Sequence, residues 1–224
     1  IAGNFELEQV KTLVNKWYGD IPSGLKPARI LPAEPQQTEF REQIIERNVP
    51  SDAFYYAFKM PERKSPDYYI ADILSDALGR DKSSRLYVKI QKELKLVTEI
   101  GAYITGSLDD GLIIISGKLS PDVTFQQLDD ALWIVLNEIK ETTISDIELA
   151  RLKNKIKTAK AFQEQGLLNR AMNLCLFELL GDAEGVNQEA LIYSEIEPKH
   201  IQTVAKQVLN QSNCSLLKVK TIQS

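Results

Sequence analysis

Histidine and cysteine are scarce in this sequence. Its 224 residues include one histidine, His200, and two cysteines, Cys175 and Cys214. A protein zinc site takes three or four histidine, cysteine or carboxylate ligands in a defined geometry, so a single histidine cannot form a conventional one. The two cysteines are too few and too far apart for a zinc knuckle or a disulfide framework. We therefore expect no zinc-dependent catalysis from this chain alone.

Several other signatures are also missing. No apolar run approaches the length of a membrane-spanning helix, and no signal peptide is visible. Lys and Arg total 27 against 31 Asp and Glu, without a basic stripe, which argues against nucleic-acid binding. There is no GxSxG nucleophile elbow, and the segment 79–84 lacks the spacing of a phosphate-binding loop.

What is present suits one folded domain with a short extra segment before it. Hydrophobic residues make up 43% of the chain, which is enough for a sizeable core. The sequence starts with Ile1 and not with Met, so we expect it to be cut from something longer, and localisation stays unknown. Residues 6–18 have apolar side chains at helical spacing. Prolines and glycines follow through residue 37 and predict an extended linker.

The remaining residues predict an α+β fold with an antiparallel-rich mixed sheet covered by helices. Alternation, aromatic content and turn residues indicate the strands, and 3.6-residue periodicity with capping residues indicates the helices. Two of the strands, Val97–Gly106 and Asp110–Leu119, are expected to pair as a hairpin. The other predicted strands are Thr38–Glu46, Asp52–Met60 and Cys214–Val219, and the predicted helices cover 66–78, 84–94, 122–139, 145–165, 167–180, 185–194 and 198–209.

Four segments together resemble the insulinase/pitrilysin family of inverted-motif zinc metallopeptidases, which includes the mitochondrial processing peptidases. They match the family in order and spacing across nearly the whole chain. The segments are IAGNFELEQVKTLVNKWYGDIPSG at the start, Leu78-Gly79 through Ser84-Arg85-Leu86-Tyr87, TISDIELARLK at 143–153, and CSLLKV at 214–219.

The resemblance implies a half-domain of a larger peptidase. Members of this family pair homologous domains that enclose a peptide in a chamber, and one domain binds zinc through an HxxEH helix and a distant glutamate. Residues 1–20 resemble the tail of a preceding homologous domain, 21–37 the Pro-rich linker, and 38–224 an inactive insulinase-like peptidase domain. The implied partners are homologous domains of the same chain or of a partner subunit, and a peptide substrate.

The helix predicted at 66–78 takes the place of the metal-binding helix. Laying the family's motif on it puts Asp72, Ser75 and Asp76 at the His, Glu and His positions. Their i, i+3, i+4 spacing places them on one helix face. Two carboxylates without further ligands make a weak cation site, so we interpret this face as an acidic surface, either solvated or facing the chamber. We predict no metal ligand and no cofactor in this chain, and zinc in the catalytic domain of the parent protein.

A second test concerns the Arg and Tyr, seven residues apart, that a later domain of the family supplies to steady the substrate carbonyl. The alignment puts Gln91 at the Arg position and Thr98 at the Tyr position. Gln91 can donate a hydrogen bond but carries no charge for an oxyanion. We therefore predict no catalytic residue here, and we assign Arg85 and Tyr87 of the turn motif to helix packing and surface pairing.

The leading hypothesis is a non-catalytic domain of a zinc metalloendopeptidase that forms part of the peptide chamber. Tyr68 and Tyr69, near the Asp72 face, are possible substrate contacts, although we expect core packing to be the main use of at least one of them. His200, at a helix start, is interpreted as an ordinary polar surface residue. One alternative is a wholly inactive scaffold subunit of the same fold, and another is an unrelated α+β binding module.

Overall fold

A five-stranded sheet forms the base of the molecule. The computed structural model describes residues 1–25, 32, 34–106 and 108–222. The strands lie in the order β1-β5-β2-β4-β3; β1 runs parallel to β5, and the other neighbours are antiparallel. The α+β class and the mixed, antiparallel-rich sheet are confirmed. The strands are β1 Arg41–Arg47, β2 Ala53–Met60, β3 Val97–Ile104, β4 Gly111–Leu119 and β5 Cys214–Thr221.

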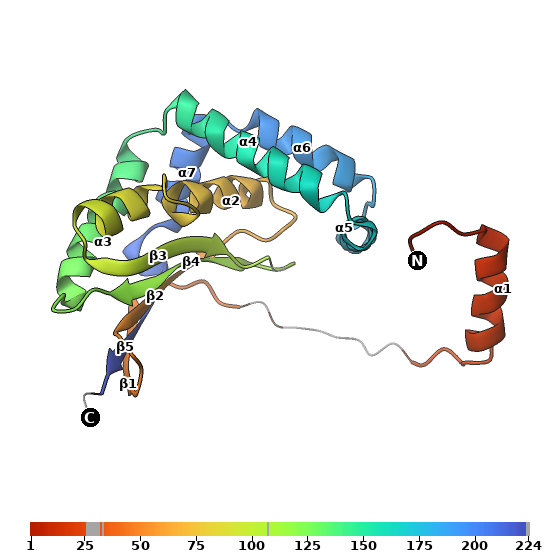
Figure 1. Ribbon diagram of the computed structural model, residues 1–224, viewed down its shortest axis with the longest axis horizontal. Coiled ribbons are helices and arrows are strands. Elements are labelled where there is room, and N and C mark those ends of the chain that lie inside the picture. The colour runs from red at the N-terminus through yellow and green to blue at the C-terminus, as the bar shows by residue number, and fades with distance from the viewer. Residues whose placement is uncertain (26–31, 33, 107, 223–224) are drawn as a thin grey trace.

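The helices cover one face of this sheet in two layers (Figure 1). In the inner layer α2 packs against β3 and α7, and α3 packs against α7. In the outer layer α4 and α6 lie over α2, and α5 packs against α6. The helices are α2 Pro66–Gly79, α3 Phe125–Glu141, α4 Asp146–Gln163, α5 Leu167–Leu180, α6 Gly185–Glu195 and α7 Pro198–Val208.

The core lies between the sheet and the inner helices. Along β2 every second side chain, from Phe54 to Met60, is buried toward the helices, as the period-2 geometry of a strand requires. In α2 the residues Ile73, Leu74 and Ala77 are fully buried against the sheet. At the end of the same helix, Gly79 lets the backbone of β3 approach closely, because a Cβ there would lie 2.2 Å from the amide nitrogen of Ala102. Helix α2 is therefore held at a fixed, short distance from β3.

The short helix after α2 differs from the expected α-helix. The segment Tyr87–Glu93 is a π-helix, η1, in which the amide of Leu94 donates to the carbonyl of Lys89 at 3.0 Å. Leu86 and Ile90 at its start are both fully buried, and Lys95 leaves it with a positive φ of 55°. A wider helical turn of this kind inserts a residue without unwinding the helix. Apolar spacing alone does not distinguish it from an α-helix.

The first helix, α1 Leu7–Tyr18, forms where predicted, but none of its residues is buried. Its apolar side chains Leu13, Val14 and Trp17 are exposed. The described residues of the predicted linker belong to no helix or strand, while 26–31 and 33 fall outside the described ranges. The division into 1–20, 21–37 and 38–224 stays a prediction. Among the described residues, no helix combines the length and apolarity that crossing a membrane requires.

Candidate functional site

Helix α2 carries the three residues that the resemblance places at the metal-ligand positions. The helix begins at Pro66, and the Ser65 hydroxyl accepts a hydrogen bond from the Asp67 amide. Of the two expectations for this face, solvated or facing the chamber, the first does not hold for Ser75 and Asp76, which are 1% and 2% exposed, and the second stays a prediction. The outer helices α4 and α6 cover this face, and helical periodicity cannot reveal a second layer.

A cavity of about 300 Å³ lies against this covered face. The Tyr193 hydroxyl donates to Asp72 at 2.6 Å, and Arg80 pairs with Asp76 at 3.0 Å. Burial raises the pKa of Asp72, and the hydrogen bond from Tyr193 opposes this shift. Burial likewise raises the pKa of Asp76, against the opposing charge of Arg80. Both carboxylates are thus committed to partners within the chain.

A second set of charged side chains, paired with one another, closes the cavity from the side of α6. Glu189 accepts from Arg63 at 2.9 Å and forms an ion pair with Lys160 at 2.5 Å, and all three side chains are 12–16% exposed. Arg63 also donates to the Tyr68 hydroxyl at 2.7 Å and lies over the Tyr68 ring, 4.5 Å from its centroid. These contacts join the loop before α2 to α4 and α6. We call Arg63, Lys160 and Glu189 the buried ion triad.

The residues around this cavity do not fit a zinc ion. Its lining contributes four cationic side chains against three carboxylates, so a divalent cation would meet an excess of positive charge. Asp72 already accepts a hydrogen bond from Tyr193, and Asp76 is already paired with Arg80. The third carboxylate, Glu189, is already paired with two cations. Within the described ranges no group of three His, Cys, Asp or Glu side chains could hold a metal.

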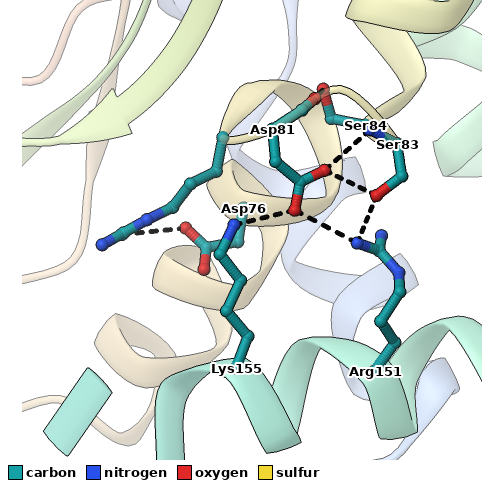
Figure 2. Close-up of polar contacts among 7 residues, drawn as sticks. Asp76, Asp81, Ser83, Ser84, Arg151 and Lys155 are labelled. Carbon is teal, nitrogen blue, oxygen red and sulfur yellow. Dashed lines mark hydrogen bonds and ion pairs between the residues drawn. The ribbon is translucent and has the colours of Figure 1, made fainter. Parts of the chain in front are cut away.

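The turn after α2 is tied to α4 by one carboxylate (Figure 2). Asp81 accepts from the amide and hydroxyl of Ser83 at 2.9 and 2.6 Å. Arg151 and Lys155 reach it from α4, at 3.2 and 2.8 Å. The two cations are four residues apart and share one helix face. Partial burial of Asp81 opposes its ionisation, but the hydrogen bonds from Lys155 and Ser83 outweigh it and hold its pKa well below the usual range.

This low pKa predicts a pH-dependent contribution to stability. The ionised Asp81 stabilises the fold above the pKa of an unfolded aspartate, about 3.9, and this contribution is lost as the pH falls toward the lower folded-state pKa. Asp81→Asn is expected to lower the free energy of unfolding at pH 7 by about 1.5–3 kcal/mol, the range for hydrogen bonds to charged groups. Urea unfolding of both proteins from pH 7 to pH 2 measures the difference between their free energies of unfolding. This difference should become smaller below about pH 4. A difference independent of pH would contradict this account.

The two tyrosines proposed as substrate contacts are both buried. Tyr68 accepts from Arg63, and Tyr69 packs edge-on against Tyr68 and Tyr193, with centroid distances of 5.6 and 5.2 Å. These contacts describe packing, as expected for at least one of the pair. Tyr68 also lines the cavity. Contact of either ring with a substrate stays a prediction.

The Arg and Tyr positions of the family remain neighbours in space. The Gln91 side-chain amide in η1 donates to the backbone carbonyl of Thr98 at 2.7 Å. Thr98 lies at the start of β3, beside a bulge between Val97 and Glu99. The Gln91 side-chain amide is thus engaged by the start of β3, and it offers no charged hydrogen-bond donor. The absence of a catalytic role for both residues stays a prediction.

The remaining motif residues have structural partners. Arg85, just before η1, donates twice to Glu148 of α4, at 3.2 and 2.9 Å. His200 is a half-buried residue of the first turn of α7, where its Nδ1 accepts from the Glu197 amide at 3.1 Å. No motif in the sequence marks Arg63, Lys160, Glu189 or Tyr193 as residues of this site. The spacing of basic residues along α4 was the one available signal for this site. The residues that pair with these basic side chains lie far away in the sequence.

Comparison with known proteins places the chain in a family. Residues 1–156 match the family model described as "Peptidase M16 inactive domain". The match covers more than half of the chain, so the chain belongs to the M16 zinc protease family, as an inactive domain. This result confirms the resemblance to insulinase-type metallopeptidases. An uncharacterized zinc protease of Bacillus subtilis (strain 168), YmxG, is 24% identical over 159 residues, which are 70% of this chain and 37% of that protein.

Solved structures share the fold. A protease from Helicobacter pylori superposes with a TM-score of 0.88 and 18% identity, over 98% of this chain and 53% of its own. A chain of Complex III2 from Candida albicans superposes with a TM-score of 0.79 and 18% identity, over 97% of this chain and 53% of its own. The chain therefore spans about half the length of these structures and about a third of YmxG.

Proposed function

We propose that this chain is the non-catalytic domain of a zinc metalloendopeptidase and forms part of the peptide-enclosing chamber beside a separate zinc-binding domain. The observation that carries the proposal is the cavity over α2. Where the catalytic domain of the family places its metal, this chain has the half-buried Asp72 and the buried Asp76, held by Tyr193 and Arg80. The excess positive charge around them disfavours a metal ion. Zinc is assigned to the catalytic domain of the parent protein.

The domain's part in the chemistry is then architectural. It forms a wall of the chamber, and hydrolysis requires a zinc-binding domain and an Arg/Tyr-bearing domain in the same chain or in a partner subunit. Gln91 offers a neutral amide already bound to Thr98, which supports the assignment of the oxyanion role to another domain. Tyr68, at the cavity lining, is the better candidate for a substrate contact.

A second candidate function is a scaffold subunit without any peptidase activity. The similarity to a chain of Complex III2 from Candida albicans favours it, because that chain is part of a larger complex. The two functions differ in the assembly that contains the chain. A native assembly with bound zinc and chelator-sensitive peptidase activity supports the peptidase domain, and one with neither supports the scaffold.

The first prediction from this proposal concerns the chain by itself. After dialysis the purified chain is expected to hold no stoichiometric zinc and to cleave no unstructured fluorogenic peptide. Metal analysis and a peptide-cleavage assay with and without a chelator test it. The matched variants are Asp76→Ala, in the cavity, and Asp130→Ala, an exposed aspartate of α3. Chelator-sensitive cleavage that Asp76→Ala abolishes and Asp130→Ala leaves intact would refute the non-catalytic assignment.

A further inference from the structure

The cavity over α2 is lined by hydrogen-bond donors that lack an acceptor among the described residues. Arg63 donates from one guanidinium nitrogen to the Tyr68 hydroxyl and from another to Glu189, but its Nε is buried and has no partner in the described part of the chain. The Tyr68 hydroxyl accepts from Arg63, and no described residue accepts its own proton. A buried donor without an acceptor is unfavourable. An added acceptor would therefore stabilise this end of the cavity.

The charge of the lining favours an acceptor that is an anion. Four cationic side chains of the lining face three carboxylates. Beside the cavity Asp81 pairs with Lys155, but it also pairs with Arg151, so including these two neighbours leaves the excess of one positive charge unchanged. An uncompensated charge in a partly closed site is costly. One negative charge restores neutrality, whereas two would reverse the sign of the imbalance.

The shape and polarity of the cavity limit the size of its ligand. A volume of about 300 Å³ is at the lower end of the range for ligand sites. Tyr68 is 2% exposed, whereas Arg80 is 53% exposed, so the cavity is closed at the donors and opens between the end of α2 and α4. Ile104 and Ile156 add hydrocarbon surface to the lining. A small ligand with one charged end and one apolar end matches these properties.

We propose that this cavity binds a small organic monocarboxylate. The carboxylate accepts hydrogen bonds from the Tyr68 hydroxyl and from Arg63, and the hydrocarbon part lies against Ile104 and Ile156. Guanidinium and hydroxyl donors are strong partners for a carboxylate, because the charge of the acceptor shortens and strengthens each hydrogen bond. The inference goes beyond the proposed function and is independent of it, since such a ligand binds the chain itself in a peptidase or in a scaffold.

An NMR titration of the purified chain with sodium propionate at pH 7 tests the proposal, with the ionic strength held constant by sodium chloride. Propionate is expected to give saturable amide shifts around Tyr68 and Ile156, with a Kd of about 1 mM or tighter. Propionamide has the same shape without the charge and should bind at least about tenfold more weakly. Shifts that do not saturate, or equal affinity for the two ligands, would overturn the proposal.

Two tyrosine variants locate the site. Tyr68→Phe keeps the ring and removes the hydroxyl, so it is expected to weaken propionate binding by about tenfold or more. Tyr55→Phe is the matched control, because Tyr55 of β2 is 42% exposed and lies outside the cavity lining. It should bind propionate like the parent chain. Amide spectra of both variants verify that the fold is retained. Equal affinities in Tyr68→Phe and Tyr55→Phe contradict a carboxylate at this position.

A charge-preserving variant and a dianion complete the test. Arg63→Lys keeps the positive charge and removes Nε, and it is expected to bind propionate about tenfold more weakly. If this variant does not fold, the Tyr68→Phe comparison still decides the outcome. Sulfate, which carries two charges at pH 7, should bind more weakly than propionate, and tighter sulfate binding would refute the monocarboxylate. None of these measurements involves zinc or peptide cleavage, so their failure contradicts this inference alone.

Discussion

Glu189→Leu is expected to lower the free energy of unfolding by about 3–5 kcal/mol, the cost of removing one partner from a buried ion pair. Glu189 is the one carboxylate of the buried ion triad, with Arg63 at 2.9 Å and Lys160 at 2.5 Å. Its loss leaves two cations in a site that is largely closed to water. The Tyr68 hydroxyl still contacts Arg63, but a neutral oxygen cannot balance the charge.

The matched control is Glu93→Leu in η1. Glu93 also pairs with a lysine, Lys89 at 3.1 Å, but both side chains are about half exposed. Water and salt screen such a pair, so its loss should change the free energy of unfolding by less than about 0.5 kcal/mol. Urea unfolding at pH 7, with both variants compared at constant m-value, measures the difference. Similar losses in the two variants would show that the triad is screened like a surface pair.

A third variant separates pairing from packing. Glu189→Gln retains the shape of the side chain and removes its charge, so it should lose nearly as much stability as Glu189→Leu if the charge is responsible. Retention of most of the stability in Glu189→Gln would attribute the effect to shape. The comparison shows whether charge or shape holds the loop before α2 to α4 and α6 through the triad.

The fold was largely predictable because its signals are local. Alternating burial in β2, the Ser65-Pro66 helix start and the capping residues of α3 and α4 each depend on a few neighbouring residues. These patterns placed the helices and strands to within a few residues of their observed ends. The π-helical form of η1 was missed, because it arises from one extra residue per turn while Leu86 and Ile90 keep their burial.

The site was less predictable because its contacts are distant in the sequence. The spacing of Asp72, Ser75 and Asp76 correctly placed them on one helix face. Only the fold could reveal that α4 and α6 cover that face and that Glu189 closes it from more than a hundred residues away. An amphipathic pattern records which side of a helix is polar. It does not record whether water or another layer of charged side chains meets that side.

The contact between α2 and β3 gives the last prediction. Gly79→Ala is expected to lower the free energy of unfolding by about 3 kcal/mol, at the upper end of the usual cost of overpacking. The new Cβ would lie 2.2 Å from the Ala102 nitrogen and 2.7 Å from the Ala102 Cβ. One of these is a backbone atom of β3, so relief requires a shift of the helix or the strand. No side-chain rotation can remove that contact.

The sign of the effect makes this test decisive. In a helix without this contact, replacing glycine with alanine stabilises by about 1 kcal/mol through helix propensity. Gly101→Ala is the matched control, since its Cβ would meet only the Gly79 carbonyl oxygen at an ordinary 3.5 Å. Urea unfolding should therefore separate the two alanine variants by several kcal/mol. A Gly79→Ala protein as stable as the parent would mean that α2 is free to move away from β3. The position of Asp72 and Asp76, which line the cavity, would then not be fixed by the contact between α2 and β3.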